Sequence, residues 1–296
     1  MKERNAAMAS RLLGRLPLDQ DALAQDLAMI NSFPRVPEEY DEFSSGFWKN
    51  CSLWNDTGDS LDTQYRTYEG QARQTAYGEK LPYVGQLLRR HFDFRHLKMV
   101  RVRNLIDAII LPHRDFVELE GERSRYFRVF VALEHNLDSF HSDEESVFQM
   151  QPGEVWWLDA AIVHAAANFS PKSRAHLCLD FQFPTAEFDA SDIFADRGGI
   201  DFDVTPTLKS REVFDAGEEA LAAFAPALTP HTFRDMAFLL SKLHFDKAVP
   251  IIACFDWLAT MAARQEDKAL EEKAKRLRSY MIERRELGER FSFAEA

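Results

Sequence analysis

The middle of the chain is a series of short apolar or alternating runs separated by turn-forming residues. Side chains on a strand alternate between two faces, and short strands that follow one another at turns are typical of antiparallel sandwiches and barrels. We expect a mainly β fold with α-helices, in which the strands form a double-stranded β-helix, a jelly-roll or cupin-like core open at one end. The predicted strands are residues 97–103, 107–117, 126–134, 146–150, 154–158, 162–169 and 174–183.

Helical spacing flanks the predicted strands on both sides. Asp19 can cap a segment whose apolar residues recur three and four positions apart, which predicts a helix over residues 19–31, and residues 81–92 have similar spacing. We expect a double-stranded β-helix domain with N-terminal helices over residues 1–200 and a C-terminal helical domain over residues 201–296. The C-terminal helices are predicted at residues 229–244, with Thr229 as cap and a proline after it, 250–261 and 265–287.

Composition excludes several classes of partner. The net charge of −12 argues against nucleic acid or an anionic membrane, because phosphate binding requires a basic surface. The N-terminal residues lack the apolar region of a signal peptide, and no run approaches the roughly 18 apolar residues of a membrane span. The three cysteines are scattered and form no disulfide pattern. We expect a cytoplasmic, soluble protein whose partner is a small molecule; its oligomeric state stays open, with a homodimer among the options.

A metal-binding pattern lies within the predicted strands. His113 and Asp115 are two positions apart in the run 107–117, so both side chains can face the same way and share one cation. His164, on a later strand, would complete a 2-His-1-carboxylate triad, the ligand set of non-haem Fe(II) oxygenases. This triad leaves three coordination positions for a chelating co-substrate and O₂. An isolated H-x-D is often accidental, and a single histidine on an apolar strand is more often a core residue.

Arg174 follows His164 by ten residues, across a turn at residues 168–173. Enzymes with this triad commonly bind 2-oxoglutarate, whose far carboxylate needs a cation deep in the barrel, and an arginine binds a carboxylate through two hydrogen bonds. A three-residue loop would put His164 and Arg174 on the same face, whereas a two-residue loop would put them on opposite faces. The sequence predicts Arg174 as the co-substrate anchor and leaves this register open.

Between residues 36 and 183 the chain resembles the bacterial free-proline hydroxylases of the Fe(II)/2-oxoglutarate family, most closely the proline 3-hydroxylases. The resemblance implies Fe(II), O₂ and 2-oxoglutarate as cofactors and co-substrate, the jelly-roll fold, and hydroxylation of free L-proline, at the cis-3 position first. Because close relatives act on pipecolate and other amino acids, a different free or carrier-bound amino acid stays an alternative. The resemblance is carried by residues 38–49, 53–60, 111–119, 125–128, 140–144, 152–160 and 164–170.

The resemblance also implies substrate contacts. This family uses arginines on the corresponding strands to hold the carboxylate of the amino acid, which points to Arg128 and, with less force, to Arg103. A charge among apolar strand residues is costly unless it is paired, so a buried ion pair is the alternative for both. His141 matches a family histidine near the substrate or 2-oxoglutarate, and the alternative is a surface loop histidine.

Two other functions could use the same metal ligands. A cupin-like metal-binding protein without turnover would need no dicarboxylate anchor such as Arg174. A zinc hydrolase would need a general base near the open coordination position, and no residue in the sequence suggests itself for that role. The sequence therefore favours an enzyme, a 2-oxoglutarate-dependent dioxygenase that hydroxylates a free cyclic amino acid.

Overall fold

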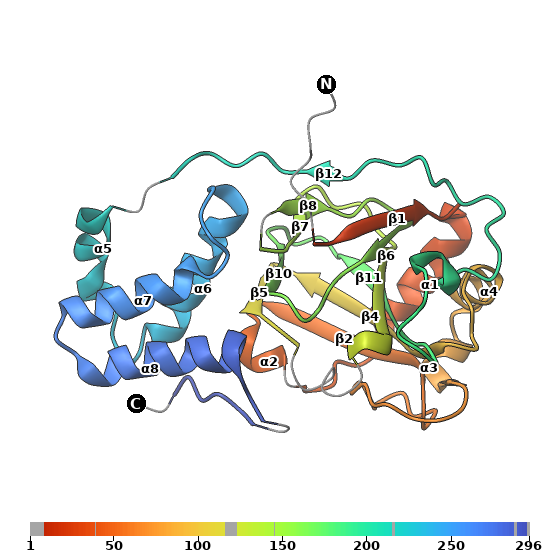
Figure 1. Ribbon diagram of the computed structural model, residues 1–296, viewed down its shortest axis with the longest axis horizontal. Coiled ribbons are helices and arrows are strands. Elements are labelled where there is room, and N and C mark those ends of the chain that lie inside the picture. The colour runs from red at the N-terminus through yellow and green to blue at the C-terminus, as the bar shows by residue number, and fades with distance from the viewer. Residues whose placement is uncertain are drawn as a thin grey trace.

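Two antiparallel β-sheets form the centre of the computed structural model (Figure 1), which describes residues 9–38, 40–115, 123–144, 146–214, 217–286 and 289–294. The larger sheet contains β1 (Arg11–Arg15), β2 (Phe47–Asn55), β3 (Arg73–Gln74), β4 (Leu97–Ile106), β6 (Tyr126–Ala132), β9 (Glu154–Trp157) and β11 (Ala175–Gln182). The smaller sheet contains β5 (Ala108–His113), β7 (Ser139–Ser142), β8 (Val147–Gln149), β10 (His164–Asn168) and β12 (Thr207–Leu208).

The strands from β4 to β11 have the connectivity of a jelly roll. Their order is β9-β6-β11-β4 in the larger sheet and β8-β7-β10-β5 in the smaller sheet. Along the chain, each connection in this stretch crosses from one sheet to the other, apart from the β7–β8 hairpin. This arrangement is a double-stranded β-helix, and it encloses an interior between the two sheets. The predicted fold class is confirmed.

Each predicted strand overlaps an observed one, although residues 116 and 117 of the predicted run 107–117 lie outside the described residues. The predicted runs do not include β1, β2, β3, β7 and β12. β2 escaped prediction because polar residues interrupt its apolar pattern, although nearly the whole strand is buried. The buried ammonium of Lys49 donates to the carbonyl oxygens of Ile30 (2.8 Å), Asn31 (3.1 Å) and Phe33 (2.9 Å). These carbonyls lie at the end of the first helix, where backbone oxygens lack helical partners and attract a cation.

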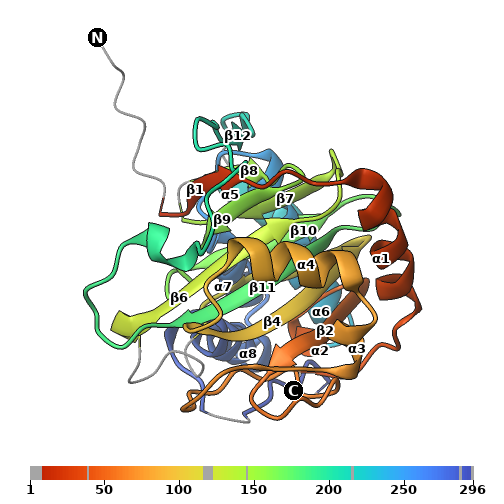
Figure 2. The same ribbon diagram turned by 90° about the vertical axis from the view of Figure 1, so that its right-hand side faces the viewer.

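The predicted N-terminal helices are confirmed as α1 (Gln20–Ser32) and α4 (Pro82–His91). The carboxylate of Asp19 caps α1 by accepting from the backbone N–H groups of Asp21 (3.1 Å) and Ala22 (3.0 Å). Both helices cover the outer face of the larger sheet (Figure 2), where their apolar residues share one core with alternate residues of β4 and β11. Two shorter helices, α2 (Tyr40–Phe43) and α3 (Ala76–Glu79), complete this part of the chain.

The C-terminal third is helical, as predicted, and packs against the smaller sheet (Figure 1). The predicted start at Thr229 was wrong, because Thr229 and Thr232 hydrogen-bond each other in a turn before the helix begins at Phe233. The domain boundary at residue 200 stays a prediction. The helices are α5 (Glu218–Phe224), α6 (Phe233–Asp246), α7 (Ala253–Arg264) and α8 (Lys268–Arg278), which continues as a π-helical turn over Ser279–Glu283.

Arg114 joins this helical part to the end of β5. Its backbone N–H donates to the carbonyl oxygen of Met281 (3.0 Å), and its guanidinium donates to those of Ile282 (3.3 Å) and Ala161 (2.7 Å). The π-helical turn is thereby bonded to the residue between His113 and Asp115. In the described part of the chain, no helix is long and apolar enough to cross a membrane.

Candidate active site

The three predicted metal ligands meet at one end of the barrel. His113 is the last residue of β5 and His164 the first of β10, and the two are paired in the antiparallel register. Asp115 lies two residues beyond β5, where its backbone N–H donates to the carbonyl oxygen of Ala160 (2.9 Å). One ligand atom from each of the three side chains lies within 4.8 Å of the others.

The histidines present the right nitrogen to a metal. Nδ1 of His113 lies 2.9 Å from the carbonyl oxygen of Leu111, and Nδ1 of His164 lies 2.9 Å from that of Ile162. A carbonyl oxygen can only accept, so each Nδ1 carries the proton and each Nε2 keeps a lone pair. Burial and the neighbouring His164 hold the pKa of His113 well below its ordinary value, which keeps it neutral. Two neutral imidazoles and one carboxylate fit Fe(II).

Asp115 is held from two sides. Its Oδ1 accepts from the hydroxyl of Tyr40 (3.0 Å) and lies 3.7 Å from Nε2 of His113, while its Oδ2 accepts from Nη1 of Arg128. Burial alone would raise the pKa of this carboxyl, but Arg128 and the two histidines hold it below its usual range. Asp115 is therefore an anion suited to a cation.

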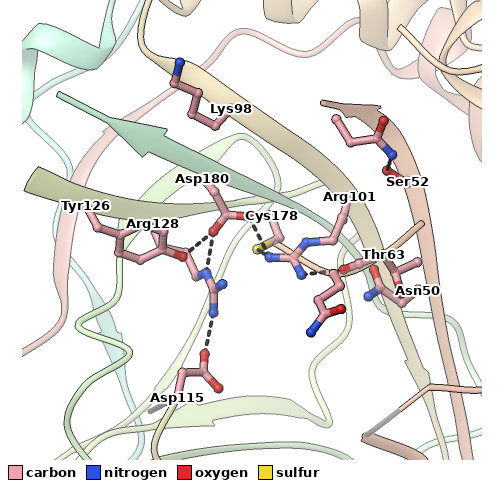
Figure 3. A network of polar contacts seen from close by, with 12 residues as sticks. Asn50, Ser52, Thr63, Lys98, Arg101, Asp115, Tyr126, Arg128, Cys178 and Asp180 are labelled. Carbon is pink, nitrogen blue, oxygen red and sulfur yellow. Dashed lines mark hydrogen bonds and ion pairs between the residues drawn. The ribbon is translucent and has the colours of Figure 1, made fainter. Parts of the chain in front are cut away.

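Asp180, which the sequence analysis did not select, links two arginines behind Asp115 (Figure 3). Its Oδ1 accepts from Nε of Arg128 (2.7 Å) and from the hydroxyl of Tyr126, and its Oδ2 accepts from Nη2 of Arg101 (2.6 Å). Burial opposes ionisation here too, but the two arginines keep the pKa of Asp180 below its usual range. Arg128 thus makes the buried ion pairs that were its alternative role, and its contact with the substrate stays a prediction.

The inward face of β11 carries polar residues at alternate positions. Leu177, Leu179 and Phe181 pack outward into the core shared with α1 and α4, so His176, Cys178 and Asp180 face the interior. His176 lies opposite Arg103 of β4 in the register. From the sequence, a surface or packing role was expected for His176, although its spacing of two from Arg174 and four from Asp180 indicates that all three share a face.

Arg174 and His141 meet in this interior. Nη2 of Arg174 lies 2.6 and 2.7 Å from the two ring nitrogens of His141. His141 is buried on β7, and is not the surface loop residue of the alternative interpretation. It pairs with Ala166, two residues from His164, so His141 and His164 face the same side. The loop-length argument for whether His164 and Arg174 share a face does not apply, because it assumed a hairpin and β10 and β11 belong to different sheets.

Several buried polar atoms around Arg174 and Arg103 have no hydrogen-bond partner among the described residues. Buried polar groups are nearly always hydrogen-bonded, so such a cluster indicates where a polar ligand binds. Burial and the nearby Arg103 lower the pKa of Arg174 to about 9, which reflects a cation without an anion beside it. A dicarboxylate fits this environment. The atoms are Nε and Nη2 of Arg103, Nε of Arg174 and Nδ1 of His176.

Arg103 lies among aromatic rings. Its guanidinium carbon is 5.2 Å from the ring centre of Tyr40, 5.9 Å from that of Trp48 and 5.7 Å from that of Phe130. Tyr40 also contacts Asp115, so this arginine lies between the metal ligands and Arg174. The sequence-predicted residues are therefore brought together, while Tyr40 was missed because nothing in its local pattern shows which residue its hydroxyl reaches.

Comparison with known proteins identifies relatives over nearly the whole chain. Residues 190–289 match the family model for the C-terminal part of L-proline 3-hydroxylase, and residues 19–184 match that for aspartyl/asparaginyl β-hydroxylase. L-proline cis-3-hydroxylases 2 and 1 from Streptomyces are 46% and 43% identical over 96% of this chain and 99% of theirs. L-proline cis-4-hydroxylase from Rhizobium meliloti (strain 1021) is 30% identical, over 95% and 99%.

The buried histidines predict how stability depends on pH. Burial, followed by Arg174, holds the pKa values of His141 and His176 well below the ordinary value near 6.5. The unfolded chain therefore binds protons that the folded protein does not, and the free energy of unfolding should fall as the pH drops below about 6.5. For the metal-free protein we expect a loss of about 1 kcal/mol per such histidine between pH 6.5 and 5.5, measured by urea unfolding. The loss should be smaller in His176→Gln; an equal loss there would contradict this origin.

Proposed function

The chain belongs to the L-proline 3-hydroxylase family, and from this we propose that it hydroxylates free L-proline at the cis-3 position, using Fe(II), O₂ and 2-oxoglutarate. The observation that carries the proposal is the group formed by His113, Asp115 and His164, with three ligand atoms within 4.8 Å. It faces an interior in which Arg103 and Arg174 have guanidinium nitrogens without hydrogen-bond partners among the described residues. Relatives named as cis-3-hydroxylases are more similar than the one named as a cis-4-hydroxylase, which favours C3 over C4.

We assign His113, Asp115 and His164 as the iron ligands. Bound iron would supply the oxidising chemistry, with O₂ consumed and 2-oxoglutarate converted to succinate and CO₂ as one proline C–H bond is hydroxylated. The protein contributes orientation: the carbonyls of Leu111 and Ile162 fix the histidine tautomers, as described above. Burial of the site excludes water from the reacting groups.

Arg174 is assigned to the far carboxylate of 2-oxoglutarate. Its guanidinium is buried, has one nitrogen without a partner among the described residues, and faces the same interior as the triad. His141 contacts Arg174 directly, which supports a place for His141 at the co-substrate end of the cavity, the second of its two predicted positions. His176 lies beside them: its ring stacks on that of His141 with 5.5 Å between the ring centres, and its Nδ1 has no hydrogen-bond partner among the described residues.

Arg103 is the better placed of the two arginines proposed to bind the proline carboxylate. Nε and Nη1 of Arg128 already contact Asp180 and Asp115, whereas Nε and Nη2 of Arg103 have no partner in the part of the chain that the structure describes. The rings of Tyr40 and Phe130 beside Arg103 offer an apolar surface to a pyrrolidine ring. Arg128 keeps a proposed second contact, since it also lies on the triad side of the interior.

The proposed reaction can be tested directly. Protein reconstituted with Fe(II) without O₂, then given O₂, 2-oxoglutarate and L-proline, should form succinate and cis-3-hydroxyproline in nearly equal amounts. His164→Ala should lose both products and keep its fold, because His164 lines the cavity and is only partly buried. Mass spectrometry quantifies succinate and the hydroxylated amino acid, and NMR assigns the hydroxylated carbon. The same assay is run with pipecolate and other amino acids in place of L-proline. Turnover of another amino acid in preference to proline, or a cis-4 product, would overturn the substrate or the position.

Arg174→Lys should raise the KM for 2-oxoglutarate roughly 10- to 100-fold and leave the KM for proline nearly unchanged. Lysine keeps the charge but loses the second hydrogen bond to a carboxylate. Steady-state kinetics with each substrate varied in turn check this, with the exposed Arg90→Lys as the matched control for the same substitution. A change confined to the KM for proline would move Arg174 to the amino-acid end of the site.

Arg103→Met and Arg128→Met separate the two arginines. Arg103→Met should raise the KM for proline at least about tenfold and lower the hydroxyproline formed per succinate, with Fe(II) affinity unchanged, because only substrate position is lost. Arg128→Met should also weaken Fe(II) binding, because Asp115 loses its partner. Paired product assays, Fe(II) titration and thermal melts distinguish these results. If Arg128→Met lowers only the melting temperature, its role is a structural ion pair.

A further inference from the structure

We propose that Asp180 is a positioning residue for the metal ligand Asp115, and that it acts through the guanidinium of Arg128. The inference rests on the proposed function, since it takes Asp115 as an iron ligand. Asp180 keeps Arg128 from binding both oxygens of Asp115, so that one oxygen stays directed at the histidines.

Asp180 is well placed for this role because its own carboxylate is fixed. It is fully buried in the middle of the larger sheet and accepts hydrogen bonds from both neighbouring strands, β4 and β6. Arg101 of β4 holds one oxygen, and Arg128 and Tyr126 of β6 hold the other (Figure 3). Arg101 is itself tied to the carbonyl oxygen of Thr63 (2.9 Å). Rotation of the Asp180 carboxylate would break several of these bonds at once.

A fixed Asp180 fixes the plane of Arg128. The guanidinium is planar and rigid, so the bond from Nε to Asp180 determines where the other nitrogens point. Nη1 then reaches Oδ2 of Asp115 and leaves Oδ1 facing His113. Oδ2 is bonded to a charged guanidinium, whereas Oδ1 accepts from the neutral hydroxyl of Tyr40 (3.0 Å) and faces His113, so Oδ1 is the oxygen offered to a metal. A carboxylate that binds through one oxygen leaves three positions for 2-oxoglutarate and O₂.

Among the described residues, loss of Asp180 would leave Arg128 with one buried carboxylate partner, Asp115, instead of two. The pairing then favoured is a bidentate one, in which two guanidinium nitrogens contact both oxygens of Asp115. Such a pair would compete with the metal for the oxygen that now faces His113. An alternative explanation is that Asp180 only neutralises the buried charges of Arg101 and Arg128. In that case the affinity for the metal would not depend on Asp180 through Arg128.

A double-mutant cycle on Fe(II) affinity tests the proposal. Asp180→Asn should raise the Kd for Fe(II), measured anaerobically by calorimetry, at least about tenfold, as is typical when a residue behind a metal ligand is lost. In an Arg128→Met background the same substitution should leave the Kd unchanged, because the residue through which it acts is absent. Additive effects in the double variant would overturn the proposal. So would an unchanged Kd in Asp180→Asn.

Glu154→Gln is the matched control. Glu154 is another fully buried carboxylate with three donors: Arg15 (2.8 Å), the indole N–H of Trp156 (2.9 Å) and the backbone N–H of Gln151 (2.9 Å). Its loss should lower the melting temperature without changing the Kd for Fe(II). If Asp180→Asn fails to fold, Tyr126→Phe removes one donor from Asp180 and should raise the Kd by a smaller factor, with no effect counting against the proposal.

The charge-transfer absorption of the anaerobic Fe(II)–2-oxoglutarate complex gives a second readout. Its position and intensity depend on the ligands around iron, so Asp180→Asn should alter it at saturating Fe(II), whereas Glu154→Gln should not. Failure of the wild type to bind Fe(II) at all would instead contradict the proposed function. Normal binding and turnover by the wild type with an additive cycle would contradict only the role of Asp180.

Discussion

Four arginine side chains are buried between the two sheets, and the cost of removing them from water governs the rest of the site. Arg101 and Arg128 are compensated by Asp180 and Asp115, whereas Arg103 and Arg174 have nitrogens without partners among the described residues. A buried charge is costly unless it is paired. The interior therefore has one region where the arginines are already paired with aspartates and another where they can accept an anionic ligand. Arg101 and Arg128 support the proposed metal ligands, and Arg103 and Arg174 supply the positive charge that fits carboxylate ligands.

The alternation of side chains along the strands of the jelly roll places these arginines and aspartates on its inner face. On β11 every second residue faces inward, and the paired register sets Arg103 opposite His176 and Arg128 opposite Asp180. The crossing of successive strands between sheets then brings β5 and β10 against the same interior from the other side. Residues far apart in the chain are thus connected: Asp115 and Asp180 both accept hydrogen bonds from Arg128.

How much of this could be predicted from the sequence depended on whether the signal was local. The grouping of His113, Asp115 and His164 could be predicted because the first two lie two positions apart and the third lies in an apolar run, and the fold could be predicted because turns separate its strands. The expectation that Asp115 lies on the same strand as His113 was wrong, because β5 ends at His113. Asp180 and Tyr40 were not, because their roles depend on which strands become neighbours, and local periodicity does not determine strand order. β2 was missed since the partner of Lys49 is the end of a distant helix. The domain boundary and the roles of the individual site residues stay predictions.

The hydrogen bonds of Arg114 connect the segment of the proposed metal ligands to the C-terminal helices. Arg114 separates two proposed ligands in the sequence and is hydrogen-bonded to the π-helical turn at the end of α8. The C-terminal helices accordingly support the geometry of the H-x-D segment, through Arg114 and through the contacts that α6 and the π-helical turn make with β5.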